Sequence, residues 1–202
     1  MNKTLEFILK KYNVNWDGKT QIIELPNSRW DSYVSLLKEL DFNSGVEMGV
    51  CDGRFSQALC SANPNLKLTG VDAWKVYDGY VDYATDFLEV RAYKRAIERS
   101  NKFGFKIIKA WSLDAVKEFE DESLDFVFID GNHDFRHVTD DVDEWSKKIK
   151  RGGIVSGHDF FKNYHEHYGV REAIPAWCDA HRIKPLFIFT KDKCPSWMYI
   201  KE

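Results

Sequence analysis

Hydrophobic residues along this chain alternate between short apolar runs and stripes with helical spacing. Residues 124–129 form a nearly continuous apolar run, as in a strand buried on both faces of a parallel sheet. Val138, Val142, Trp145 and Ile149 recur at helical spacing and predict a helix packed on that sheet. Further strands are predicted at 45–50, 67–71, 105–109, 154–156, 185–190 and 197–200, and further helices at 3–12, 28–40, 54–62, from after 83 to about 101, 113–119 and 170–181.

This alternation of strands and helices from residue 43 onward predicts the fold class. It is typical of an α/β fold with a Rossmann-like, doubly wound sheet that is mostly parallel. The last two strands are joined by a short polar connection and are expected to form an antiparallel hairpin. We expect one domain over 1–202, in which 1–42 form a helical cover and 43–202 the Rossmann-like core.

Composition and charge narrow the classes of partner. The 202 residues carry a net charge of −3 with scattered lysines and arginines, so we expect no nucleic-acid partner. No apolar run approaches the length of a membrane span, and the N-terminus has no secretory pattern, so we expect no membrane partner. The four cysteines lie far apart and form no metal-type pair, which predicts reduced thiols and a cytoplasmic location.

Candidate site residues follow the predicted strands, where open α/β sheets bind ligands. The first such turn holds Gly49 and Gly53, and Glu47 and Asp52 beside them suit a cationic ligand; a tight structural turn is the alternative. Asp72 ends the next strand and could accept both ribose hydroxyls of a nucleoside, or serve as a cap or turn residue. Ser112 follows the third strand, where it could line an adenine pocket, although a helix N-cap is favoured.

The turn after the fourth strand has the highest density of ionisable groups. Asp130, His133 and Asp134 fall within five residues there, and His158-Asp159 follow the fifth strand. Because the carboxyl ends of parallel strands meet at one edge, we expect these groups to converge with the glycine turn. The structural alternatives are that His133 caps the next helix and His158 packs under the rim. Asp134 is expected to be a first-turn acid of that helix.

These motifs, taken as a series, resemble those of class I S-adenosylmethionine-dependent methyltransferases. The series is Glu47-x-Gly49-x-x-x-Gly53, Gly70-Val71-Asp72, Asp125 to Gly131 and Arg151-Gly-Gly-Ile-Val. The version with Asp130-Gly-Asn-His-Asp134 and Gly157-His158-Asp159 is similar to the bacterial small-molecule group that includes macrocin O-methyltransferase-like enzymes. The resemblance covers roughly 43–201.

The resemblance implies a fold, a cofactor and an activity. The sheet would have seven strands with the last antiparallel, and the cofactor would be S-adenosylmethionine. The activity would be methylation of a small-molecule acceptor, expected at a hydroxyl oxygen. Members of the family often form homodimers, although the sequence shows no interface.

The resemblance also assigns residues to parts of the cofactor. The methionine portion would lie on Glu47, Gly49, Val50, Cys51 and Gly53; the ribose on Asp72 with the adjoining Ala73 and Trp74; and the adenine on Ser112. Asp130 would lie near the sulfonium and the acceptor.

The resemblance leaves the activation of the acceptor open between a metal and a base. Metal-dependent relatives of the catechol O-methyltransferase type hold Mg²⁺ on the aspartate after strand four and an acidic or amide pair after strand five. Asp130, His158 and Asp159 take those positions here, and a histidine ligand weakens a Mg²⁺ site or favours a softer ion. Without a metal, His133 is the candidate base, with Asp130 as its catalytic neighbour.

Two other motifs have both a functional and a structural interpretation. Trp74, Tyr77, Tyr80 and Tyr83 recur every three residues and could grip an acceptor as a lid, or bury their rings at a helix start. His165-Glu166-His167 has metal-like spacing but is expected to be solvated. A non-catalytic S-adenosylmethionine-binding regulatory domain is the main alternative function. A metallophosphoesterase is a weaker one, because only its Gly-Asn-His-Asp signature is present.

Overall fold

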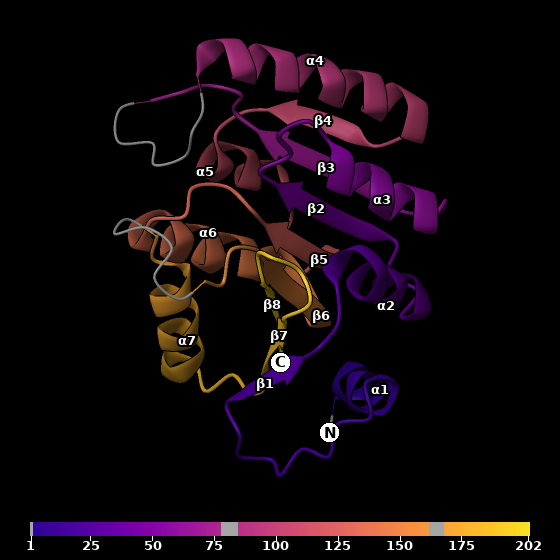
Figure 1. Ribbon diagram of the computed structural model, residues 1–202, viewed down its shortest axis with the longest axis vertical. Helices are drawn as coiled ribbons and strands as arrows, with labels where there is room; N and C mark the ends of the chain where they lie inside the picture. The colour runs from indigo at the N-terminus through magenta and orange to yellow at the C-terminus, as the bar shows by residue number, and fades with distance from the viewer. Residues whose placement is uncertain (1, 78–84, 162–167) are drawn as a thin grey trace.

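Figure 1 shows the computed structural model, in which helices lie on both faces of one twisted sheet. The structure describes residues 2–77, 85–161 and 168–202. The strands are β1 (Ile22–Leu25), β2 (Ser44–Met48), β3 (Lys67–Asp72), β4 (Lys106–Lys109), β5 (Leu124–Ile129), β6 (Ile149–Gly157), β7 (Leu186–Phe189) and β8 (Ser196–Ile200). The helices are α1 (Lys3–Lys11), α2 (Val34–Glu39), α3 (Arg54–Ala62), α4 (Asp86–Phe103), α5 (Ser112–Ala115), α6 (Phe135–Lys148) and α7 (Val170–Ala180), with a π-helical turn η1 (Arg29–Tyr33) and a 3₁₀ turn η2 (Val116–Glu118).

The sheet alternates its side chains between two apolar cores. Along β5, Phe126 and Phe128 face the core under α1, α2 and α3, whereas Val127 and Ile129 face the core under α6 and α7. The predicted stripe on α6 is buried in the second core, where Trp145 is inaccessible to solvent. Burial on both faces explains why the central strands are apolar at nearly every position.

The strand order confirms the predicted α/β class, with one difference in strand number. In the described part of the chain the sheet has eight strands in the order β1-β7-β8-β6-β5-β2-β3-β4, and β8 is antiparallel to both neighbours. The additional strand is β1, which pairs in parallel with β7 at the edge of the sheet. The N-terminal segment, expected to contribute only helices, therefore also extends the sheet. Only four residues of β1 pair with β7, and polar residues precede them, so the apolar pattern is too short to predict a strand.

The order also places a topological switch point in the middle of the sheet. From β2 the chain winds outward through β3 and β4, then returns to β5 on the other side of β2. The helices that follow β2 and β5, α3 and α6, therefore pack on opposite faces of the sheet, and open α/β sheets bind ligands in the crevice at the carboxyl ends of such strands. Among the described residues, no helix has both the length and the apolar content needed to cross a membrane.

Candidate active site

The glycine turn after β2 lies directly against the turn after β5. Gly49 has φ of 91°, and a Cβ atom added to it would lie 1.8 Å from the carbonyl oxygen of Asp130. A side chain is therefore excluded at Gly49 both by its left-handed backbone and by the neighbouring turn. Gly53, with φ of 80°, begins α3. The two turns are thus held in close contact at the switch point.

A cavity of about 950 Å³ opens over this edge of the sheet, a size that suits a nucleoside-sized ligand. Six residues predicted to bind the cofactor line it: Gly49, Cys51, Asp72, Ala73, Ser112 and Asp130. Within the described part of the chain, Glu47, Val50, Gly53 and Trp74 lie outside its lining. The lining also contains Asp52, which the sequence suggested for a cationic ligand. It further contains the carboxylates of Glu89, Asp140 and Asp141, for which the sequence predicted no binding role.

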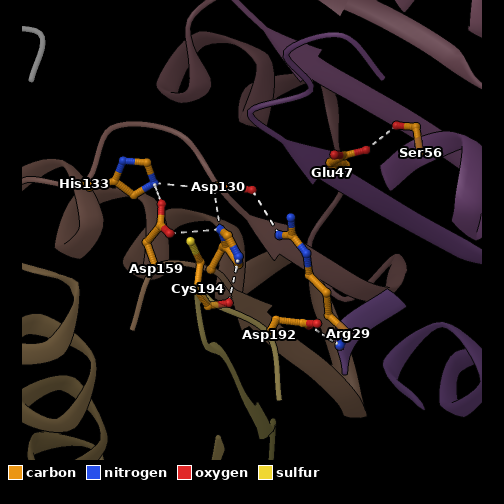
Figure 2. Close-up of polar contacts among 9 residues, drawn as sticks. Arg29, Glu47, Ser56, Asp130, His133, Asp159, Asp192 and Cys194 are labelled. Atoms are coloured by element: carbon orange, nitrogen blue, oxygen red, sulfur yellow. Dashed lines mark hydrogen bonds and ion pairs between the residues drawn. The ribbon is translucent and has the colours of Figure 1, made fainter. Parts of the chain in front are cut away.

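Glu47 lies below the cavity as a buried acid. Its side chain is paired with Ser56, whose hydroxyl donates to the Glu47 Oε2 atom (Figure 2). Burial raises the pKa of Glu47 to about 8, and the neighbouring Asp130 adds to this shift while the Ser56 hydrogen bond opposes it. The carboxyl therefore joins the base of the glycine turn to α3.

Asp72 holds the glycine turn in place through both of its carboxylate oxygens. The backbone N–H groups of Cys51 and Trp74 donate to them at 2.8 and 2.7 Å. Burial raises the pKa of Asp72, although these N–H donors act in the opposite direction. The Trp74 indole in turn donates to the Cys51 carbonyl at 2.8 Å and is buried beside Val50. Trp74 and Val50 thus support the turn from below.

Ser112 connects the cavity to the buried face of α6. Its hydroxyl donates to the Oδ1 atom of Asp141 and accepts the indole N–H of Trp145 at 2.8 Å. Burial raises the pKa of Asp141 to about 7. Ser112 lies in the first turn of α5, and its N-cap position belongs to Trp111, so the predicted N-cap role is wrong. Asp141 could have been suspected from the sequence, because it lies on the same helix face as the apolar residues Val138, Val142 and Trp145.

Asp130 lines the cavity and also contacts a cluster of ionisable side chains, which Figure 2 shows. Its Oδ1 atom lies 3.4 Å from His133 Nε2 and 3.4 Å from His158 Nδ1. Asp159 bridges the same two imidazoles, at 2.9 Å from His133 Nε2 and 3.1 Å from His158 Nδ1. The structure therefore brings together all four residues that were predicted as catalytic or metal-binding.

His158 has polar contacts at both ring nitrogens. Its Nε2 atom lies 3.1 Å from the Cys194 carbonyl oxygen, which can only accept, and its Nδ1 atom faces the two carboxylates. Burial opposes protonation, but Asp130 and Asp159 outweigh it and raise the pKa of His158 to about 9. His158, Asp159 and Cys194 also offer ligand atoms within 4.8 Å of one another, as do Asp130, His133 and Asp159, so the metal role predicted for His158 stays a prediction.

The two aspartates are ionised in return. Burial raises the pKa of Asp130, yet the positive charge of His158 and hydrogen bonds from His133 and His158 hold it well below its usual range. Burial also opposes ionisation of Asp159, but its hydrogen bonds with His133 and His158 lower the pKa of this carboxyl. His133 stacks on Tyr168 with the ring planes 4° apart, which fixes the imidazole beside both carboxylates.

Arg29 completes this cluster from the N-terminal segment, and nothing in the sequence indicated it. Its Nη1 atom lies 3.4 Å from Asp130 Oδ2, and its backbone N–H donates to Asp192 at 2.7 Å. Asp192 also accepts the hydroxyl of Ser28 at 2.7 Å. The segment before α2 and the loop between β7 and β8 are thus joined beside the site.

The remaining predicted residues have mixed outcomes. Asp134 is the N-cap of α6, accepting the His137 N–H at 3.0 Å, where a first-turn acid was expected. Tyr77 lines the cavity and accepts a hydrogen bond from the Asn132 amide. Tyr80 and Tyr83 of the predicted lid lie outside the described residues, as does the sequence His165-Glu166-His167.

The chain is similar to known proteins both in sequence and in fold. The profile of a family described as "Methyltransferase domain" matches residues 46–160. An uncharacterized protein, y4gI of Sinorhizobium fredii, is 24% identical over 147 residues, or 72% of this chain. The chain spans only 15% of the length of that relative.

Several solved structures share the fold across the whole chain. An O-methyltransferase from Bacillus cereus, in complex with SAH, is 12% identical with a TM-score of 0.63, covering 100% of this chain and 92% of its own. The O-methyltransferase TomG from Streptomyces achromogenes, in complex with SAM, is 12% identical with a TM-score of 0.60, covering 100% and 91%. At this identity the likeness concerns the fold alone.

Proposed function

This chain belongs to the methyltransferase-domain family, and from that premise we propose that it transfers a methyl group from S-adenosylmethionine to a hydroxyl oxygen of a small-molecule acceptor. Membership makes it a class I methyltransferase enzyme. The position of the cofactor, the acceptor class and the roles of individual residues are our proposal, and so is any activity of a longer protein that contains this domain.

The observation that carries the proposal is the position of Asp72 and Asp130 in the cavity at the switch point. They line it at the carboxyl ends of β3 and β5. The rest of the charged lining is mixed, with the carboxylates of Asp52, Glu89, Asp140 and Asp141 and the cations of Arg54, Lys75, Arg91 and Arg95. S-adenosylmethionine, when bound, supplies an electrophilic methyl group on a positively charged sulfur atom. The ionised carboxylate of Asp130, whose pKa lies well below its usual range, complements such a cation. The structures of relatives in complex with SAH and SAM agree with this choice.

The residues of the cavity suggest how the cofactor would be oriented. Asp72 accepts one backbone N–H on each oxygen, and each oxygen retains a lone pair that could accept a ribose hydroxyl. Gly49 lets the turn pass close to the ligand because no side chain intervenes. At the other end, Asp141 is a better candidate than Ser112 for an adenine amino group, since the Ser112 hydroxyl is already engaged with Asp141 and Trp145.

His133 is proposed as the general base. Methyl transfer to a hydroxyl requires removal of the hydroxyl proton, and the His133 Nε2 atom lies 3.4 Å from Asp130, which lines the cavity. Asp159 lies 2.9 Å from the same Nε2 atom that faces Asp130, and its carboxylate would stabilise the imidazole after proton uptake. Asp130 keeps a negative charge next to the position proposed for the sulfonium.

The proposal is tested by a binding and a turnover experiment in sequence. Calorimetric titration with S-adenosylhomocysteine should show one site per chain, and a screen of small hydroxylated acceptors with labelled S-adenosylmethionine should show methyl transfer. Absence of binding at millimolar ligand would contradict the cofactor assignment. Binding without transfer to any hydroxyl, but with transfer to amines or thiols, would instead correct the acceptor class.

A further inference from the structure

Cys194 lies outside the segment that matches the family profile, yet its sulfur atom lies beside Asp159 and His158 in Figure 2. It belongs to the loop between β7 and β8, and the matched segment ends at residue 160. Its Sγ atom, a ring nitrogen of His158 and a carboxylate oxygen of Asp159 lie within 4.8 Å of one another. His158 is buried and the other two are half-buried. Thiolate sulfur, imidazole nitrogen and carboxylate oxygen are the donor types that proteins use to bind Zn²⁺.

The orientation of the His158 imidazole suits a ligand at its Nδ1 atom. The Nε2–H donates to the Cys194 carbonyl oxygen at 3.1 Å, so the lone pair of the neutral ring lies on Nδ1. Histidine ligands in proteins are commonly held in this way, by a hydrogen bond from the second ring nitrogen to a carbonyl or a carboxylate. In the metal-free chain a proton takes the position on Nδ1, and a bound ion would displace it.

The donor atoms around His158 Nδ1 are spaced as in one coordination sphere. Four donors bound to Zn²⁺ at about 2.0–2.3 Å in a tetrahedron are roughly 3.3–3.7 Å apart. Nδ1 lies 3.1 Å from Asp159 Oδ1 and 3.4 Å from Asp130 Oδ1, close to that range. The second oxygen of each carboxylate has another partner, because Asp159 Oδ2 faces His133 at 2.9 Å and Asp130 Oδ2 faces Arg29 at 3.4 Å. The donor set thus does not include His133, the proposed base.

Backbone contacts hold the loop that carries Cys194 against the rest of the site. After Cys194, the Pro195 carbonyl oxygen accepts the N–H of Phe160 at 3.0 Å. Before it, the Asp192 carboxylate accepts the N–H of Arg29 at 2.7 Å. The loop is therefore fixed on both sides of the thiol, which is the kind of support that keeps a metal ligand in position.

We propose that Cys194, His158, Asp159 and Asp130 bind a divalent transition-metal ion of the Zn²⁺ class. Mg²⁺ requires oxygen donors, whereas a sulfur and a nitrogen in the set favour a softer ion, and Cys194 is the residue that decides this preference. Binding releases the thiol proton and the Nδ1 proton to solvent. Because Asp130 also lines the cavity, the ion would lie at the edge of the cavity. When bound, such an ion is a Lewis acid beside the proposed acceptor position.

The test is a titration of the reduced full chain with Co²⁺ after treatment with EDTA, followed by absorption spectroscopy. We expect one Co²⁺ per chain and a thiolate-to-cobalt charge-transfer band, which an excess of Mg²⁺ leaves unchanged. Cys194→Ser should lose this band and bind Co²⁺ at least about tenfold more weakly. Cys51→Ser, which removes an exposed thiol that lines the cavity, is the matched control and should keep both the band and the affinity.

Each outcome decides the proposal. Absence of Co²⁺ binding at millimolar ion overturns it, and so does a charge-transfer band that persists in Cys194→Ser or that Mg²⁺ abolishes. Co²⁺ binding that is lost in His133→Ala but unchanged in Cys194→Ser also contradicts the proposal. It would place the ion on the other set of ligand atoms within 4.8 Å, those of Asp130, His133 and Asp159.

A second measurement uses the unmodified chain, in case Cys194→Ser does not fold. Saturating Co²⁺ should slow the alkylation of Cys194 by iodoacetamide by about tenfold or more, because a coordinated thiolate is a poor nucleophile, while Cys51 reacts at an unchanged rate. Mass spectrometry measures both rates, and equal rates at Cys194 with and without Co²⁺ would contradict the proposal. Neither measurement needs S-adenosylmethionine or an acceptor. Binding of S-adenosylhomocysteine without binding of Co²⁺ would therefore contradict the metal site alone, and the reverse would contradict the cofactor assignment alone.

Discussion

The Nε2 atom of His133 lies 2.9 Å from the Oδ2 atom of Asp159, closer than its 3.4 Å approach to Asp130. The two residues come from different turns, one after β5 and one after β6, and only the sheet brings them together. A carboxylate at this distance fixes the imidazole and stabilises its protonated form. Of the two nearby carboxylates, Asp159 is therefore the partner of the proposed base, and Asp130 is left to face the cavity.

Replacing His133 should separate turnover from cofactor binding. In His133→Ala we expect turnover to fall by about 100-fold or more, because a positioned base contributes about this much, while affinity for S-adenosylhomocysteine stays within about twofold. Labelled methyl transfer measures the first quantity and calorimetry the second. His181→Ala is the control, since His181 is exposed at the end of α7. Parallel loss of binding and turnover would indicate that His133 is structural.

Alanine substitutions at Gly49 and Gly104 separate the cost of breaking the contact between the two turns from the cost of a side chain at positive φ. Both have positive φ, 91° and 80°, but a Cβ atom would meet the Asp130 carbonyl at 1.8 Å only at Gly49 and would meet nothing within 4 Å at Gly104. Gly104→Ala should therefore lower the free energy of unfolding by about 1 kcal/mol, the backbone cost alone. Gly49→Ala should cost several times as much and abolish S-adenosylhomocysteine binding. Urea denaturation and calorimetry measure both effects, and similar costs at the two positions would contradict the close packing of the turns.

The sequence predicted most of the fold because the central strands bury both faces. Residues of β5 and the stripe on α6 are apolar for that reason, and their patterns predicted a buried strand and a packed helix. β1 was not predicted, because a four-residue edge strand after a polar segment has no distinctive pattern. The same limit applies to its π-helical neighbour η1, whose residues fit the helix predicted over 28–40.

The candidate site was partly predictable for a related physical reason. Gly49, Asp72 and Asp130 each follow a strand, so their positions could be inferred from the sheet alone. Arg29 could not, because its place depends on the packing of the N-terminal segment against Asp192 and three aromatic rings. The orientation of the His158 ring was equally hidden, since it follows from the Cys194 carbonyl, which accepts the Nε2–H.

Asp72 should be required for cofactor binding through its carboxylate geometry. Asp72→Asn replaces one accepting oxygen by a donor, which would face the N–H of Cys51 or Trp74 and could not accept a ribose hydroxyl. We expect the affinity for S-adenosylhomocysteine to fall by about 10- to 100-fold, equivalent to about 1.5–3 kcal/mol for hydrogen bonds to a charged group. Asp121→Asn, at an exposed acid paired with Lys148, controls for the loss of charge. Unchanged affinity in Asp72→Asn would place the ribose elsewhere.

Asp141 should make stability depend on pH between about 4 and 7. Its pKa is about 7 in the folded chain, against 3.8 for an unperturbed group, because burial penalises the charged form. In that window the folded state binds more protons than the unfolded state, so the free energy of unfolding falls as pH rises.

The neutral variant Asp141→Asn isolates this effect, because its amide oxygen can still accept the Ser112 hydroxyl. Relative to the variant, the unmodified chain should lose up to about 1.4 kcal/mol of stability per pH unit up to about pH 7, and no more above it. Urea denaturation at several pH values measures the difference, with Asp143→Asn on the exposed side of α6 as the control for charge. Parallel profiles for the two proteins would mean that Asp141 is ionised throughout. If the stabilities of the two proteins instead converge at low pH, Asp141 is protonated in the folded chain there. A ligand that enters the cavity could then ionise or engage this acid, so nucleoside affinity near pH 7 is the next quantity to measure.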